Sequence, residues 1–351
     1  MTISRRGFFG LLAAAAAAVG LPVAWYSRNY AGPVSDHFDG VRFFDPEGAQ
    51  LKSPIHLLKW QLTPNKPTWP EWAPSPLPPD EPPQRVNGNK IRFAFVGHAS
   101  WLIQTAGLNI LIDPIWSDRA SPVTFAGPKR HNDPGIAFDK LPPIDVVLVS
   151  HGHYDHLDMP TLSKLAAKDS PRVITPLGND FVMRAGDSAI NASGYDWGDR
   201  VEIGNGIAVT LVRTRHWSAR GMFDRNKTLW ASFVLETPSG KIYIVCDSGY
   251  GDGKLFRDAK AAHGPLRAAI LPIGAYEPRW FLKDQHMSPS DAVMALNDCG
   301  AQQAFAHHFG TFKLTDELID QPVSDLHAAL DEKGIARERF LAPKPGQVFE
   351  I

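Results

Sequence analysis

Short apolar runs bounded by turn residues dominate the chain after Asn89, and their lengths favour β-strands over helices. Several runs are apolar at nearly every position, which is typical of strands buried on both faces of a sheet. The pattern predicts strands within residues 91–97, 100–113, 145–151, 172–176, 207–214, 230–237, 241–249, 268–273 and 302–308.

Three helical stretches lie between these runs, at residues 159–168, 288–300 and 323–334. The first two have proline or serine signals at their N-termini and the last two end on glycine, as helix termini often do. Many strands interleaved with a few helices predict a layered α/β domain in which helices cover two sheets.

Residues 34–89 are rich in proline and tryptophan. They show neither the helical nor the strand periodicity of apolar residues, apart from a possible short helix at residues 53–62. We predict an irregular arm packed on the domain, with Trp60, Trp69 and Trp72 buried against it instead of forming an exposed apolar patch. The predicted organisation is a signal or N-terminal anchor at residues 1–33, the arm at 34–89 and one domain at 90–351.

The N-terminal segment "SRRGFFGLLAAAAAAVGLPVAW" carries two adjacent arginines, Arg5 and Arg6, before an uncharged apolar stretch. It resembles a twin-arginine export signal, although an amphipathic start or a short membrane anchor has the same composition. Residues 11–25 are short for a full membrane span, which needs about 20 apolar residues. We expect export, with the protein in the periplasm or attached to the inner membrane of a bacterium.

Composition and charge exclude some classes of protein. A chain of 351 residues with 44% hydrophobic content can bury a sizeable core in one large domain or two average ones. The net charge of -1, without a long run of Lys and Arg, excludes the electrostatic pattern of a nucleic-acid-binding protein. Cys246 and Cys299 lie in apolar contexts, so we expect two small buried residues and no disulfide framework.

Residues 150–158, "SHGHYDHLD", concentrate three histidines and two aspartates. At the end of a strand, His151 and His153 point the same way and can hold one cation between them. Asp155 and His156 follow the turn and can face a second cation. The alternative, a hydrated polar loop, requires five ionisable groups to cluster by chance, so the segment favours a metal site.

Further candidate ligands follow other apolar runs: His216, Asp247 and His308. Each residue alone could be structural. Strand ends of α/β proteins converge on one edge, where binding sites form, so their recurrence at strand ends supports a shared metal site.

The pattern His-x-His-x-Asp-His, followed by a distant His, an Asp and a last His, resembles the metallo-β-lactamase superfamily. Strings such as "VGHASWLI", "LPPIDVVLVSHGHYDHLD", "HWSARG" and "HHFGTF" resemble the N-acylphosphatidylethanolamine-hydrolysing phospholipase D family over residues 38–351. The most specific string is "GAYEPRWFLKDQH". This resemblance implies a four-layer αββα sandwich with a metal site between the sheet edges.

The resemblance also implies a set of metal ligands. The first metal would be held by His151, His153 and His216, the second by Asp155, His156 and His308, with Asp247 bridging both. The register of "HFGTF" selects His308 over its neighbour His307, which is then expected in the core or behind the site. Five imidazoles and two carboxylates suit two Zn²⁺ ions, and iron or manganese is compatible with the same ligand types.

Other residues acquire roles by the same resemblance. Asp113 would accept a hydrogen bond from a ligand histidine, or else cap a turn before Pro114. His286 and Asp155 are the expected catalytic residues. His286 would protonate the leaving alkoxide or bind a phosphate oxygen, unless it is a surface histidine that caps a helix. Tyr154 and Gln285 match substrate-binding pocket positions, and His98 is expected to be structural and near the site.

The implied activity is hydrolysis of a lipid phosphodiester by a metal-bridging hydroxide, giving phosphatidic acid and an N-acylethanolamine. A lactonase or amidase, including a β-lactam hydrolase, could use the same metals. A non-catalytic envelope protein that binds lipid or metal is the third alternative. The resemblance further implies a phospholipid or other small ester as substrate, contact with a membrane surface, and a homodimer. Gly152 and Met159 depart from the family pattern, so the chemistry is better supported than the substrate.

Overall fold

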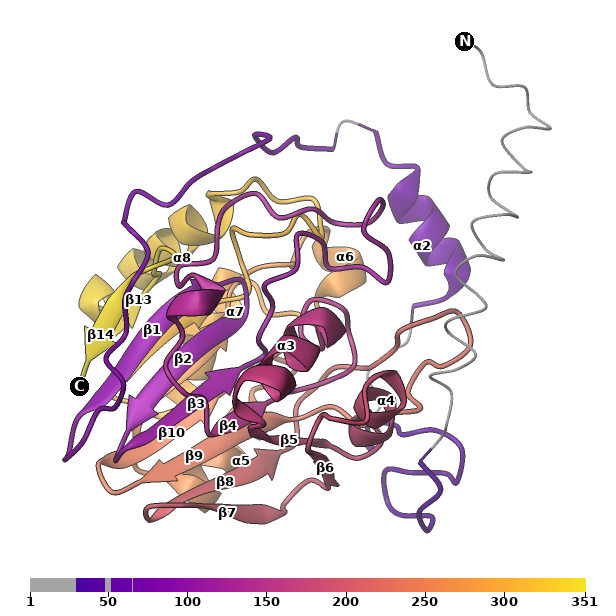
Figure 1. The fold of residues 1–351 in the computed structure, drawn as a ribbon. Helices are drawn as coiled ribbons and strands as arrows, with labels where there is room; N and C mark the ends of the chain where they lie inside the picture. The colour runs from indigo at the N-terminus through magenta and orange to yellow at the C-terminus, as the bar shows by residue number, and fades with distance from the viewer. Residues whose placement is uncertain (1–29, 48–51, 65) are drawn as a thin grey trace.

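The computed structural model describes residues 30–47, 52–64 and 66–351 (Figure 1). The export segment predicted from Arg5, Arg6 and residues 11–25 lies outside these ranges. Within them, no helix combines the length and the apolar composition that crossing a bilayer requires.

Two seven-stranded sheets form the centre of the fold (Figure 1). In spatial order, the first sheet contains β14 (Val348–Glu350), β1 (Ile91–Gly97), β2 (Ser100–Thr105), β3 (Leu108–Ile112), β4 (Val146–Leu148), β5 (Arg172–Pro176) and β6 (Ala192–Tyr195). The second contains β13 (Phe340–Leu341), β12 (Gln303–His307), β11 (Leu266–Pro272), β10 (Gly240–Ile244), β9 (Ser232–Thr237), β8 (Ile207–Val212) and β7 (Arg200–Gly204). Both sheets are mixed, with antiparallel hairpins joined to parallel strands.

Helices cover the outer face of each sheet. Leu162 of α3 (Met159–Asp169) and Val182 of α4 (Asn179–Gly186) pack in one apolar cluster with Val147 of the first sheet. A second cluster joins the other sheet to α5 (Lys254–His263), α7 (Pro289–Cys299) and α8 (Gln321–Glu332). The layers are therefore helix, sheet, sheet and helix, which confirms the predicted αββα sandwich.

The space between the sheets is filled by aromatic and branched side chains. Phe93 of β1 and Phe305 of β12 have ring centroids 5.0 Å apart, and Trp101 of β2 lies 6.0 Å from Phe305. All three side chains are fully buried. Close packing across the two sheets holds their edges in a fixed relation, which is what a site built on those edges requires.

Each predicted run contains a strand, and residues 100–113 divide into β2 and β3 at a tight turn. The predicted helices correspond to α3, α7 and α8, and both cysteines are buried and free. The pattern missed the short elements β6, β7, β13, β14, α4, α5, α6 (Arg279–Leu282), η1 (Phe138–Lys140) and η2 (Arg337–Arg339). Most of these are exposed on one side, so their apolar signal is weak.

The arm has one helix, α2 (Pro54–Gln61), where the sequence predicted it. Trp60 is buried, and its Nε1 donates to Asp316 Oδ2 at 2.5 Å. Trp69 is half-buried and donates to the Glu317 carbonyl. The expectation of burial is wrong for Trp72, which is 44% exposed. The neighbouring residue Ala73 is the less exposed of the two, and its backbone N–H donates to the His131 carbonyl at 2.6 Å.

Candidate metal centre and pocket

The predicted ligands lie in loops that follow four strands of the two sheets. The segment 150–158 follows β4, His216 follows β8, Asp247 follows β10 and His308 follows β12. The ends of these strands meet at one edge of the sandwich, so residues up to 157 positions apart in sequence become neighbours. All seven predicted ligands belong to groups of side chains whose ligand atoms lie within 4.8 Å of one another.

The first group contains His151, His153, His216 and Asp247. His153 Nδ1 lies 2.8 Å from His151 Nε2 and 3.2 Å from His216 Nε2. Asp247 Oδ2 lies 3.5 Å from His216 Nε2. Three imidazole nitrogens and one carboxylate oxygen therefore converge on one point.

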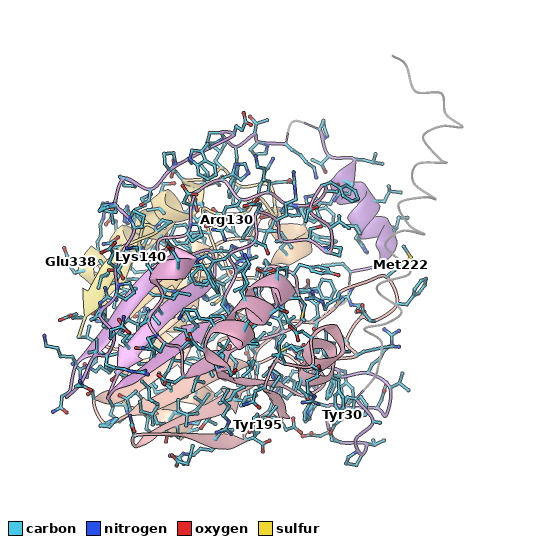
Figure 2. The ribbon with its side chains drawn as sticks, viewed as in Figure 1. Tyr30, Arg130, Lys140, Tyr195, Met222 and Glu338 are labelled. Atoms are coloured by element: carbon cyan, nitrogen blue, oxygen red, sulfur yellow. The ribbon has the colours of Figure 1, made fainter. Side chains whose placement is uncertain are left out.

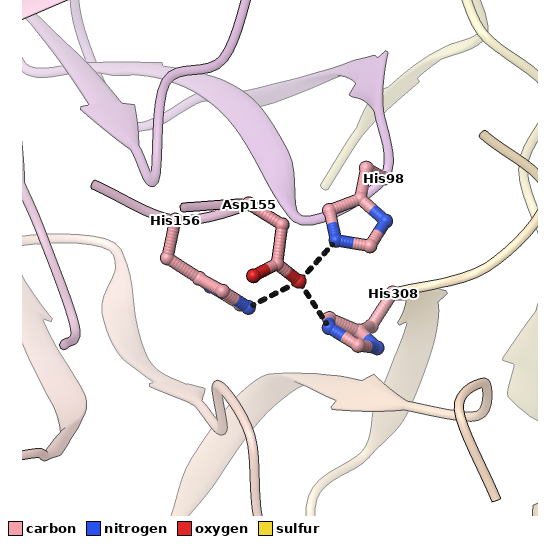
Figure 3. A group of neighbouring side chains, drawn as sticks. All are labelled: His98, Asp155, His156 and His308. Atoms are coloured by element: carbon pink, nitrogen blue, oxygen red, sulfur yellow. Dashed lines mark hydrogen bonds and ion pairs between the residues drawn. The ribbon is translucent and has the colours of Figure 1, made fainter. Parts of the chain in front are cut away.

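The second group contains His98, Asp155, His156 and His308 (Figure 3). Asp155 Oδ2 lies 3.0 Å from His98 Nε2, 3.3 Å from His308 Nε2 and 3.4 Å from His156 Nε2. Asp247 also reaches this group, because its Oδ1 lies 3.1 Å from His308 Nε2 and its Oδ2 lies 3.3 Å from His156 Nε2. Asp247 thus contacts both groups, as expected of a bridging ligand.

Several atoms at the centre of the two groups are buried and make no hydrogen bond. These include His156 Nε2 and Asp247 Oδ1. Leaving such atoms without a hydrogen bond is costly, and cations between the two groups would satisfy them. The donor set of imidazoles and carboxylates also fits zinc, iron or manganese.

The electrostatics of the centre prepare the histidines to bind metal. Burial lowers the pKa of His151 and of His216 well below the ordinary value, and lowers the pKa of His153 to about 4. These imidazoles are neutral at pH 7, and a neutral imidazole is the form that ligates a metal. Burial also lowers the pKa of His156, but Asp247, Asp155 and Asp113 outweigh it and hold the pKa well above its usual range. A dication would replace the proton that these carboxylates attract.

Hydrogen bonds behind the centre orient the ligand rings. His156 Nδ1 lies 2.7 Å from Asp113 Oδ2, the contact expected from the resemblance. Asp113 accepts further hydrogen bonds from the backbone N–H and the hydroxyl of Ser150, which also tie it to the loop of the ligands. His216 Nδ1 donates to the carbonyl of Gln285 at 3.1 Å. Each bond leaves Nε2 of its histidine directed at the metal centre.

His286 lies beside the centre and faces a pocket. Its Nδ1 is 4.0 Å from Asp247 Oδ2, and its ring centroid is 5.0 Å from that of His216. The side chain is only 12% exposed, so His286 is not a surface residue that caps α7; the cap is Ser288. Burial lowers the pKa of His286 to about 4, so its imidazole is neutral at pH 7.

A cavity of about 490 Å³ opens above the two groups. Tyr154 and Gln285, whose predicted role is to bind substrate, both line this cavity, and the Tyr154 hydroxyl donates to the Arg220 carbonyl at 2.9 Å. Eight further lining residues are apolar and come from distant parts of the chain: Leu57, Trp60, Ala120, Trp217, Ala275, Phe281, Leu282 and Leu314.

Some residues of the site differ from the sequence prediction in their contacts. His98 was expected to be structural and near the site, and it does lie there: its Nε2 contacts Asp155, a partner that the sequence did not indicate. Its φ of +54°, uncommon for a residue other than glycine, accompanies a hydrogen bond from the His308 backbone N–H to the His98 carbonyl. The motif "VGHAS" contains His98, but nothing in it indicates the contact of His98 with Asp155. His307 is a core residue that donates to the Val245 carbonyl, and it stays outside the groups.

The structure gives a local reason for Gly152, one of the two positions at which the sequence departs from the family pattern. The Gly152 N–H donates to Ser218 Oγ at 3.0 Å, and a Cβ at this position would lie 2.7 Å from the same oxygen. A larger residue therefore requires Ser218 to move. Nothing in the structure explains why Met159 stands where the family has an aromatic residue.

Residues 108–309 match the family described as Beta-lactamase superfamily domain. An uncharacterized protein of Mycobacterium tuberculosis is 33% identical over 331 residues, which cover 93% of this chain and 85% of that protein. The N-acyl-phosphatidylethanolamine-hydrolyzing phospholipase D 1 of Caenorhabditis elegans is 32% identical over 267 residues, covering 73% of this chain and 74% of that protein. Among solved structures, a possible metal-dependent hydrolase from Veillonella parvula shares the fold, with a TM-score of 0.57 at 16% identity, over 74% of this chain and 98% of that one.

Proposed function

This chain belongs to the metallo-β-lactamase superfamily and, within it, to the family of N-acylphosphatidylethanolamine-hydrolysing phospholipases D, and from that premise we propose that this metal-dependent hydrolase cleaves the phosphodiester of N-acylphosphatidylethanolamine-like lipids. The products are phosphatidic acid and an N-acylethanolamine. The observation that carries the proposal is the position of the two His/Asp groups at the base of an apolar pocket that also contains His286.

Two zinc ions would be held by the seven predicted ligands. One would bind His151, His153 and His216, the other Asp155, His156 and His308, with Asp247 shared. When bound, the two dications would supply a more acidic water and electrostatic stabilisation of the phosphoryl oxygens.

The chain itself binds and orients the lipid. The apolar wall formed by Leu57, Trp60 and Leu314 would hold acyl chains and keep bulk water from the phosphodiester. The neutral imidazole of His286 keeps one ring N–H, which would donate a hydrogen bond to an oxygen of the substrate. The reaction consumes one water, whose oxygen joins phosphorus as the bond from phosphorus to the headgroup oxygen breaks.

The test measures metal content and release of N-acylethanolamine in the wild type and in His286→Ala. His286→Ala should retain the metal and lose activity about 100-fold or more, because one hydrogen-bond donor to the reacting group is removed. His263→Ala, on the outer helix α5, is the matched control and should behave as wild type.

Two results would contradict the proposal. A wild type that opens a lactone rapidly but leaves the lipid phosphodiester intact is a lactonase. A wild type that holds two metals and hydrolyses neither compound is a binding protein.

Export is a separate proposal that rests on Arg5 and Arg6. Replacing both arginines by lysine should leave the protein in the cytoplasm, as measured by fractionation of cells that express the full chain. Normal export of this variant would exclude the twin-arginine route.

A further inference from the structure

Arg225 places an unpaired positive charge on the wall of the pocket. In the part of the chain that the structure describes, its guanidinium makes no hydrogen bond or ion pair, and its buried Nε has no partner. The other cation of the lining, Lys52, is neutralised by Asp284 at 3.3 Å. The acidic residues of the lining, Asp155 and Asp247, belong to the metal centre.

The side chain of Arg225 is directed by an aromatic contact. Its guanidinium carbon lies 4.2 Å from the centroid of the Trp217 ring, and the ring of Trp217 lies 4.4 Å from that of His153. One indole ring therefore separates the guanidinium from a ligand of the first metal. Stacking on the indole leaves the N–H groups at the edge of the guanidinium available for an anion.

The loop that carries Arg225 is anchored at both ends. Arg220 donates to the carbonyls of Gly152 and Leu157, beside the metal ligands, and Asn226 N donates to the Ser218 carbonyl at 2.6 Å. Arg42 donates to the carbonyl of Arg225 itself. Figure 2 labels Met222 of this loop on the side of the molecule where α2 lies. The guanidinium is thus held in place before any ligand binds.

An unpaired guanidinium in a half-buried position loses hydration without gaining a protein partner. Arg42 adds a second positive charge nearby, so the local field favours an anion. The metal centre would already hold the phosphodiester, whereas Arg225 lies on the far side of Trp217. A ligand that contacts the metal centre and Arg225 at the same time must carry two anionic groups. It must also carry an apolar part that packs on the remaining wall of the pocket.

We propose that Arg225 binds a second anionic group of the substrate, so that the preferred lipid has a carboxylate or phosphate in its headgroup besides the phosphodiester. This inference rests on the proposed function. It goes beyond the proposed N-acylphosphatidylethanolamine-like substrates and names phospholipids whose headgroup carries a second anion as the preferred class.

The test compares three lipids in mixed micelles with the metal-loaded enzyme. N-acylphosphatidylserine differs from N-acylphosphatidylethanolamine by one carboxylate, and phosphatidylglycerol phosphate carries a second phosphate. The wild type should prefer at least one of the two lipids that carry the additional anion. In Arg225→Gln the KM for the preferred lipid should rise about tenfold, because a charge-assisted hydrogen bond is lost, while the KM for N-acylphosphatidylethanolamine stays within about twofold.

Two further variants define the role. Arg225→Lys retains the charge but loses the planar stacking group, so it should recover part of the preference. Arg337→Gln removes a surface arginine paired with Asp331 and should leave all KM values unchanged.

A binding measurement separates recognition from turnover. N-dodecanoylserine and N-dodecanoylethanolamine are products of the two N-acylated lipids and contain no phosphodiester to cleave. In calorimetric titrations of the metal-loaded protein, Arg225→Gln should weaken binding of N-dodecanoylserine about tenfold and leave the neutral amide unchanged.

The outcomes are distinct. Equal rates on all three lipids, with no effect of Arg225→Gln, overturn the inference and leave the proposed function intact. Failure of the wild type to hydrolyse any lipid overturns the proposed function. In that case the titration with N-dodecanoylserine still tests whether Arg225 binds an anionic group. Tight binding of N-dodecanoylserine that Arg225→Gln does not change would place the carboxylate on the metals and would also overturn the inference.

Discussion

Single side chains behind the candidate metal centre determine which nitrogen His151 and His156 offer. The Ser150 hydroxyl donates to Asp113 Oδ2, and its oxygen lies 2.9 Å from His151 Nδ1. Asp113 also accepts from His156 Nδ1. One carboxylate thus orients two histidines, one directly and one through a hydroxyl, so that both direct Nε2 to the centre.

Asp113→Asn should therefore weaken metal binding about 10–100-fold, because the charge that orients His156 and Ser150 is lost while the shape of the side chain remains. Competition with a chromogenic chelator measures the affinity. Asp331→Asn, on the surface of α8, is the control. Equal affinities in the two variants would show that Asp113 does not support the ligands.

At the scale of elements, helix α2 connects the arm to the pocket. The ring of Trp60 packs 5.1 Å from that of Phe281 in α6, and its indole donates to Asp316. Leu57 of α2 lines the cavity, whereas Leu62, the residue that ends the helix, is 72% exposed and lies outside the lining. A segment that precedes the sandwich in sequence therefore completes the wall of its pocket.

Leu57→Ser should raise the KM for lipids with long acyl chains by about three- to tenfold, since apolar contact area in the pocket is lost. The value of kcat should change little, because Leu57 does not contact the two His/Asp groups. Leu62→Ser makes the same substitution outside the pocket. A rise in KM that is equal in both variants would indicate a change of α2 as a whole and not a contact with the acyl chain.

At the scale of the whole molecule, the core between the two sheets fixes the distance between the loops that carry the ligands. Phe305 of β12 packs against Phe93 of β1 and against Phe349 of β14, with ring centroids 5.0 and 4.7 Å away. Three residues after Phe305 the same chain reaches His308. Loosening the sheets at this point also loosens the second metal group.

Phe305→Ala should lower the free energy of unfolding by about 3–5 kcal/mol, because a fully buried aromatic ring is removed. Urea denaturation at one fixed zinc concentration measures the change, since bound metal itself stabilises the folded state. Phe125→Ala removes a ring that is 80% exposed and should change stability by less than about 0.5 kcal/mol. A similar decrease in the free energy of unfolding in both variants would argue against a core that depends on Phe305.

The sequence by itself determined most of the elements and the positions of the candidate ligands. Buried strands are apolar along their length, and His151, His153, Asp155 and His156 lie close together in sequence, so local patterns suffice to find them. His216, Asp247 and His308 follow such strands, and the family motif selected His308 over its neighbour His307.

Only the tertiary structure decided the distant contacts that neither the strand pattern nor the family motif indicated. The contact of His98 with Asp155 spans 57 positions, and the bond from His216 to the Gln285 carbonyl spans 69. The exposure of Trp72 and the unpaired charge of Arg225 likewise depend on loops that pack together. Such contacts are set by the packing of the sheets and leave no periodic signal in the chain, which is why no local pattern predicted them.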